Sequence, residues 1–139
     1  MMKQFFLLLL SFSLSLLAAH AGGNAAAPKD GVEVIYFHGK QRCATCICIE
    51  KYAREVVEKQ FAAQAKRGQV RYREVDISTP EGEKWARAYR VTWSSLYVTR
   101  WKQGKEKRHD LTQFAFKHAR KRPDEFKKGL ARKIIDNLK

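Results

Sequence analysis

Apolar and polar positions along the chain follow two different periods, and each period predicts an element. Residues 32–37 (Val-Glu-Val-Ile-Tyr-Phe) form a short apolar run that is rich in β-branched and aromatic side chains, which predicts a buried strand. Residues 47–64 contain no Gly or Pro, and their apolar side chains recur at helical spacing, at Ile49, Tyr52, Ala53, Val56 and Phe61. The residues between the two segments therefore lie where a strand gives way to the first turn of a helix.

The rest of the chain contains three more predicted strands. Alternation over residues 70–77 predicts the second strand, after a helix end at Arg67-Gly68. Residues 91–95 are expected to form a loop and residues 96–101 a third strand. Gln103-Gly104 predicts a tight turn into a short fourth strand near residues 106–108.

Three further helices are expected between and after these strands. Thr79 is the expected N-cap of a short helix and Pro80 its first residue. One face of that helix is expected to carry Trp85, Ala88 and Tyr89. Residues 111–120 are expected to form a helix that Pro123 breaks, and residues 124–138 the last helix. The apolar stripe of this last helix consists of Phe126, Leu130, Ile134 and Leu138.

The first thirty residues have the pattern of an export signal. Lys3 gives a positive start, residues 5–17 are apolar, and Ala19-His20-Ala21 is a small-residue cleavage site. We expect a signal peptide over residues 1–21, a disordered lead over 22–31 and one domain over 32–139. The apolar stretch is shorter than the ~20 residues that span a bilayer, although an uncleaved anchor is the alternative. The mature protein is expected in the periplasm.

The chain is strongly basic, with 28 Lys and Arg against 14 Asp and Glu and a formal net charge of +14. In a cytoplasmic protein this balance would favour nucleic-acid binding, but an exported protein rarely meets nucleic acid. The cations share helices with apolar stripes and lack interleaved aromatic side chains, so no nucleic-acid partner is expected. They form a solvated helix face, or they attract an acidic partner or anionic headgroups at the membrane periphery.

The three cysteines lie within six residues, in Cys43-Ala44-Thr45-Cys46 and at Cys48. A disulfide between Cys43 and Cys46 closes too short a loop to stabilise a fold, so the pair points to chemistry. At a helix N-terminus, free N–H groups and the helix dipole stabilise a thiolate. Cys48 points 200° away from Cys46 around the helix, which predicts a small buried apolar side chain there.

The order β-α-β-α-β-β-α with a Cys-x-x-Cys pair after the first strand resembles the thioredoxin superfamily. The resemblance covers residues 32 to about 138 and implies an α/β fold with a central mixed four-stranded sheet flanked by helices. More narrowly, residues 36–39 (Tyr-Phe-His-Gly) followed by Arg42-Cys43-Ala44-Thr45-Cys46 and Ile49-Glu50 resemble small exported thioredoxin-like proteins described as nitroreductase-subunit or arsenic-operon proteins. That resemblance implies a reductase that receives its electrons from a carrier in the membrane.

The sequence departs from the thioredoxin pattern at two positions. Members of the superfamily usually carry a cis-proline before the third strand, where this chain has Ser95. A cis bond without proline costs about 3 kcal/mol, so a trans or strained peptide is expected before Ser95. Many thioredoxins also bury a carboxylate on the first strand near the dithiol, but the corresponding residues 35–37 are apolar here, which leaves His38 as the nearest titratable substitute.

Each candidate site residue has an expected role. Cys43 is the expected nucleophile, with positive potential from Arg42 and Lys40, and Cys46 the more buried resolving thiol. His38 either shuttles the proton of Cys46 or caps the loop by a hydrogen bond. Glu50 is expected to form an ion pair with Arg54. Trp93 is expected either to line the substrate groove or merely to be packed, and Ser95 occupies the proline position.

These residues predict a periplasmic thiol–disulfide oxidoreductase whose direction of electron flow is open. The substrate is expected to be a protein or small-molecule thiol or disulfide. The only redox group expected is the cysteine pair, because the chain has no G-x-G-x-x-G motif for a flavin or nicotinamide. One alternative is a Cu(I) or Zn²⁺ binding or delivery protein that uses Cys43, Cys46 and His38. Another is a non-catalytic interaction module with the same fold.

Overall fold

The computed structural model describes residues 29–139, and the predicted signal peptide lies outside them. The strands are β1 (Gly31–His38), β2 (Val70–Asp76), β3 (Ser95–Lys102) and β4 (Lys105–Asp110). The helices are α1 (Ala44–Glu55), η1 (Val56–Gln60), α2 (Ala62–Lys66), α3 (Pro80–Tyr89), α4 (Thr112–His118) and α5 (Pro123–Leu138). Within this part of the chain, no helix is both long enough and apolar enough to cross a membrane.

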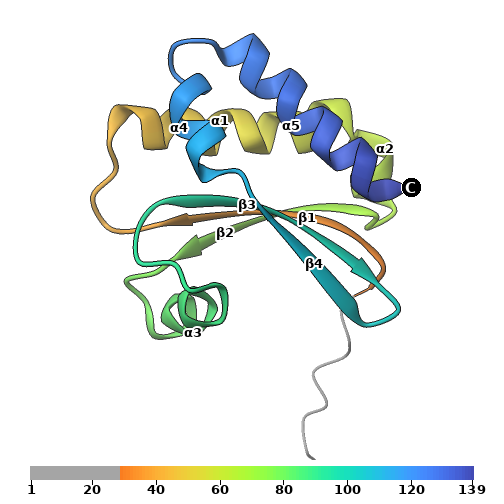
Figure 1. The fold of residues 1–139 in the computed structure, drawn as a ribbon, viewed down its shortest axis with the longest axis horizontal. Helices are drawn as coiled ribbons and strands as arrows, with labels where there is room; N and C mark the ends of the chain where they lie inside the picture. The colour runs from red at the N-terminus through yellow and green to blue at the C-terminus, as the bar shows by residue number, and fades with distance from the viewer. Residues whose placement is uncertain (1–28) are drawn as a thin grey trace, which may run out of the picture.

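One mixed sheet, in the order β2-β1-β3-β4, forms the centre of the domain. β1 pairs in parallel with β2 and antiparallel with β3, and β3 and β4 form an antiparallel hairpin. Figure 1 shows α1, α2, α4 and α5 on one face of the sheet and α3 on the other. The predicted fold class is therefore confirmed: the chain has a thioredoxin-like α/β fold.

Alternation along β1 fills two separate cores. Val32, Val34 and Tyr36 belong to the larger cluster, together with buried side chains of α1 and α5. Ile35 and Phe37 point the other way and belong to a smaller cluster with Tyr89 of α3. Residues 32–38 are all buried, since helices cover both faces of this central strand. The carboxyl end of β1, which leads into α1, is thus fixed by packing on both sides.

The pattern over residues 47–64 predicts one continuous α-helix, but the structure shows an interrupted one. It is α-helical as far as Glu55, π-helical over η1, and α-helical again from Ala62. Phe61 lies between the two last segments with non-helical dihedrals and is buried. The apolar spacing alone could not reveal the change, because both helix types present a buried face. The predicted end of the region is correct, with Gly68 at φ +73°.

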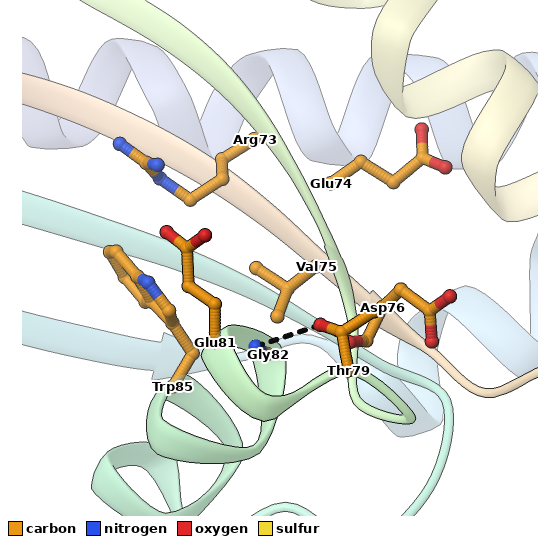
Figure 2. A pocket seen from close by; sticks show the side chains of 8 residues that line it. All are labelled: Arg73, Glu74, Val75, Asp76, Thr79, Glu81, Gly82 and Trp85. Atoms are coloured by element: carbon orange, nitrogen blue, oxygen red, sulfur yellow. Dashed lines mark hydrogen bonds between the residues drawn. The ribbon is translucent and has the colours of Figure 1, made fainter.

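Helix α3 begins as predicted, but its buried face differs by one residue. The Thr79 hydroxyl accepts a hydrogen bond from the Gly82 N–H at 3.0 Å (Figure 2). Pro80 is the first helical residue. The expectation for Ala88 is wrong, since Ala88 is exposed and Ala86 is buried. The face that packs consists of Gly82, Trp85, Ala86 and Tyr89, at the i, i+3, i+4 and i+7 positions.

The hairpin and the last two helices follow the prediction closely. Gln103 and Gly104 both have positive φ, 52° and 73°, which is the geometry of a tight turn between twisted strands. Pro123 separates α4 from α5 as expected, and it is itself the first residue of α5. Phe126, Leu130 and Ile134 are buried and Leu138 packs against the same core. The loop that carries the cysteines lies at the end of the sheet opposite this hairpin (Figure 1).

Candidate functional site

Cys43 and Cys46 form a disulfide at the start of α1, with their Cα atoms 5.0 Å apart. Cys43 is the N-cap of the helix, in an extended conformation (φ −74°, ψ 164°). Its Sγ accepts a hydrogen bond from the Cys46 N–H at 3.0 Å. A sulfur atom therefore takes the place that a Ser or Asp oxygen occupies in an ordinary N-cap, facing N–H groups that stabilise negative charge. This position favours a thiolate at Cys43 when the disulfide opens.

Cys43 and Cys46 differ in exposure in the way that their predicted roles require. Cys43 is exposed, whereas Cys46 is only 5% exposed. An incoming disulfide can thus approach Cys43 and not Cys46. Cys48 is half-buried and packs against the larger core cluster, which fits its interpretation as an apolar side chain. Their roles in exchange remain predictions.

Tyr36 of β1 contacts the cysteine pair from the sheet, and the sequence pattern did not indicate this contact. The buried hydroxyl of Tyr36 donates to the carbonyl oxygen of Cys46 at 3.1 Å. Burial raises the pKa of this phenol, and a hydrogen bond with Ser94 offsets part of the rise. Tyr36 thereby links the sheet to the cysteine helix. The alternation of β1 places Tyr36 on the α1 face, but nothing in the sequence indicates its partner.

Arg42 is held in an ion-pair network instead of pointing at Cys43. Its guanidinium pairs with Glu50 of α1 and lies 3.0 Å from Oε1 of Glu74 on β2. Burial alone would lower the pKa of Arg42, but the two carboxylates outweigh it and raise the pKa, so the side chain stays cationic. Arg54 contacts both acids as well, 3.5 Å from Glu50 and 2.5 Å from Glu74. The Glu50–Arg54 pair was predicted, and the contacts with Glu74 were not.

His38 belongs to the same network. It is buried at the end of β1, and its Nδ1 lies 2.9 Å from the carbonyl oxygen of Gly39. Its Nε2 lies 2.7 Å from Arg42 Nη2 and 3.1 Å from Glu74 Oε1. Both ring nitrogens are thus engaged, which favours the loop-capping interpretation of His38 over a proton shuttle. Within residues 29–139, no group of three or more metal-ligating side chains forms, so His38 does not join the cysteines.

A hollow of about 660 Å³ lies beside the disulfide. Its lining includes both cysteines, Ile77, and the aromatic side chains of Trp93 and Phe116. Trp93 is 60% exposed and stacks on Phe116 of α4, with ring centroids 5.3 Å apart. Trp93 thus lines the hollow and also packs on one neighbour, and its role toward a substrate stays a prediction. Phe116 was expected only as part of a helix, because its proximity to the cysteines depends on the tertiary fold.

Ser95 begins β3 opposite Phe37 of β1. None of the described residues has a cis peptide bond, so the bond before Ser95 is trans, as expected without proline. Ser95 is buried, and its hydroxyl donates to the carbonyl oxygen of Trp93 at 3.0 Å. The loop next to the cysteines is thus closed by a side-chain hydrogen bond to its own backbone.

A second, smaller hollow of about 140 Å³ lies between β2 and α3 (Figure 2). The guanidinium of Arg73 lies 4.6 Å from the Trp85 ring centroid and pairs with the buried Glu33. Arg73 and Glu33 thus satisfy each other, and the hollow contains no cysteine or histidine.

The sequence matches no protein-family model and no curated protein. Among solved structures, the chain is similar to the solution structure of a thioredoxin from Thermus thermophilus, with a TM-score of 0.49 and 20% identity, over 77% of this chain and 76% of that one. It is also similar to a structure described as a malarial protein, with a TM-score of 0.47 and 19% identity, over 76% of this chain and 99% of that one. The fold assignment itself rests on the sheet order and the placement of the helices. A thioredoxin-like fold with a Cys-x-x-Cys pair at disulfide distance fits a thiol–disulfide oxidoreductase.

Proposed function

We propose that the protein is an exported thiol–disulfide oxidoreductase whose reactive pair is Cys43 and Cys46. The observation that carries the proposal is the hydrogen bond from the Cys46 N–H to the Sγ of an exposed N-cap Cys43. A cysteine that only stabilised the fold would need neither the exposure nor the N–H groups aimed at its sulfur. We also propose the narrower kinship with nitroreductase-subunit or arsenic-operon thioredoxin-like proteins, which rests on the motif around the cysteines and names no substrate.

The exchange proceeds in two steps. The Cys43 thiolate attacks one sulfur of a substrate disulfide, forms a mixed disulfide and releases the other sulfur as a thiolate, which takes up a proton from water. The Cys46 thiol gives its proton to water, and the resulting thiolate attacks Cys43 Sγ, which forms the Cys43–Cys46 disulfide and releases the second substrate thiolate. Two electrons have then passed from the protein to the substrate. The buried position of Cys46 keeps it from competing with Cys43 for the substrate.

Turnover as a reductase needs a donor that opens the Cys43–Cys46 disulfide again. We infer a thiol-bearing electron carrier in the membrane, because the only redox group proposed for this chain is its own disulfide. Such a carrier would attack the exposed Cys43 sulfur, release Cys46 as a thiolate and take the disulfide onto its own thiols. The basic surface is available for contact with an acidic carrier or with headgroups at the membrane periphery.

Replacing Cys46 by Ala tests the two-step exchange. The reduced variant should accumulate a mixed disulfide with a peptide disulfide, because the second step is lost, and mass spectrometry should place the adduct on Cys43. Cys48→Ala is the matched control, and it should turn over as the unaltered protein does. An adduct on Cys48, or no adduct with any disulfide, would exclude the proposed roles.

Export is tested separately from the chemistry. The predicted cleavage after Ala21 means that protein recovered from the periplasm should begin at Gly22 on N-terminal sequencing. Recovery of protein with an intact Met1 in a membrane fraction would indicate that the segment is an uncleaved anchor. Either result leaves the dithiol assignment unchanged, because the two tests concern different parts of the chain.

A further inference from the structure

The surface around Cys43 combines apolar side chains with positive charge. We propose that it selects polypeptide substrates that carry a large apolar side chain and acidic residues close to their reactive cysteine. This inference rests on the proposed exchange at Cys43 and adds the class of substrate that the site prefers. Trp93, Phe116, Lys40 and Lys117 are the residues that determine the preference.

Apolar exposure is concentrated beside the disulfide. Only three large apolar side chains are exposed among residues 29–139, namely Ile47, Trp93 and Ile135. Trp93 lines the hollow that contains both cysteines. Ile47 lies one helical turn after Cys43 and lines a neighbouring hollow of about 290 Å³, and Arg42 borders both hollows. An indole that stacks on Phe116 and still exposes 60% of its surface is a ready platform for another apolar group.

Arg42 lines both hollows, one on the Cys43 side and one on the Ile47 side, so an occupant of both must extend past Arg42. A small disulfide fills one side at most, whereas an extended polypeptide places side chains on both. We therefore assign the surface to a polypeptide segment centred on a cysteine. Its apolar residue contacts Trp93, and its chain continues toward Ile47.

The electrostatics of the larger hollow favour an acidic segment. No carboxylate lines it, and the nearby acids Glu50 and Glu74 are already paired with Arg42 and Arg54. Lys40 follows Gly39 and Lys117 follows Phe116, both of which line the hollow. Lys40, Lys117 and Arg120 are exposed and form no ion pair within residues 29–139. An acidic peptide would meet uncompensated cations there and a basic one would be repelled.

A single-turnover experiment with the reduced protein tests this preference without any electron donor. The probes are two synthetic peptides with one Phe and one Cys, the Cys in mixed disulfide with 2-mercaptoethanol, flanked by Glu in one peptide and by Lys in the other. We expect the Glu peptide to oxidise the protein about tenfold faster at low salt. The ratio should shrink as the ionic strength rises from about 0.01 M to about 0.1 M, where the Debye length falls from about 30 Å to about 10 Å.

Matched variants separate local from global charge. Lys40→Gln with Lys117→Gln should reduce the Glu-to-Lys rate ratio severalfold. Lys66→Gln with Lys105→Gln removes the same charge far from the disulfide and should leave the ratio unchanged. Trp93→Ala should slow both peptides severalfold, because it removes the platform for their Phe side chain. Bis(2-hydroxyethyl) disulfide, which is too small to reach across the surface, is the reference substrate for the unaltered protein.

The small disulfide also distinguishes the two levels of failure. If it does not oxidise the protein at all, the proposed function is wrong. If it reacts but the two peptides react equally, the oxidoreductase stands and the substrate preference is overturned. If the two double lysine variants reduced the Glu-to-Lys rate ratio equally, the proposed surface would likewise be excluded, because the preference would then come from the net charge of the protein.

Discussion

Arg42 Nη2 lies 3.0 Å from Glu74 Oε1, and this contact joins the residue before Cys43 to the carboxyl-terminal half of β2. The two residues are 32 positions apart in the sequence. The same guanidinium pairs with Glu50 within α1. One side chain therefore fixes the loop that carries Cys43 against both the strand and the helix, and its charge is largely balanced by the two carboxylates.

Replacing Arg42 by Met should have a small effect on Cys43 for this reason. The helix N–H groups remain, so we expect the alkylation rate of the reduced protein at neutral pH to fall severalfold at most. Stability should fall by about 1 kcal/mol or less, because the network is partly exposed to solvent. Arg87→Met, which breaks an exposed pair with Glu83 on α3, is the control and should leave alkylation unchanged. A loss of reactivity by a hundredfold would show that Arg42, not the helix, stabilises the thiolate.

Cys43 should be alkylated before the other two cysteines when the reduced protein meets iodoacetamide. It alone combines exposure with a sulfur at a helix N-terminus. Peptide mapping at short reaction times measures the order directly. Labelling of Cys48 first would mean that its partly buried thiol is more accessible than its packing against the core implies.

Two tyrosines with buried hydroxyl groups, Tyr36 and Tyr72, should respond differently when those groups are removed. Tyr36→Phe removes the bond to the Cys46 carbonyl, which then keeps only its helical partner, and this should cost about 1 kcal/mol in urea unfolding. The Tyr72 hydroxyl is buried without a hydrogen-bond partner among the described residues, so Tyr72→Phe should be neutral or stabilising. Equal losses in both variants would indicate that the Cys46 contact adds nothing to stability.

Glu55 should make stability depend on pH in acid. A hydrogen bond from Lys127 of α5, 3.0 Å away, lowers the pKa of this carboxyl. The contribution is therefore complete above the unfolded pKa, about 4, and is lost as the pH falls through the lower folded value. Glu55→Gln should reduce the thermal midpoint at neutral pH and make no difference in strong acid. Glu58→Gln, on the same helical region but without an ion pair in the described residues, should show no such change.

The local parts of the site follow from the sequence, and the long-range parts do not. The strand-to-helix position of Cys43, the cap at Thr79 and the turn at Gly104 depend on neighbouring residues, so the sequence pattern was enough to predict them. The contacts of Arg42 with Glu74 and of Trp93 with Phe116 join separate elements, and their geometry arises only once the helices pack on the sheet. The same reason explains the error at Ala88, because only the packing of α3 decides which alanine is buried.

The π-helical segment η1 has a consequence for changes in chain length. Its hydrogen bonds run from residue i to i+5, so it holds one residue more than an α-helix needs, and its first two residues, Val56 and Val57, are both buried. Deleting one residue from this segment would convert it to an α-helix and preserve the orientation of Cys43 and Ile49 on the preceding turns. A deletion between Cys46 and Ala53 would instead rotate Ile49 away from the core. A natural or engineered deletion in the first helical region should thus be tolerated best at η1.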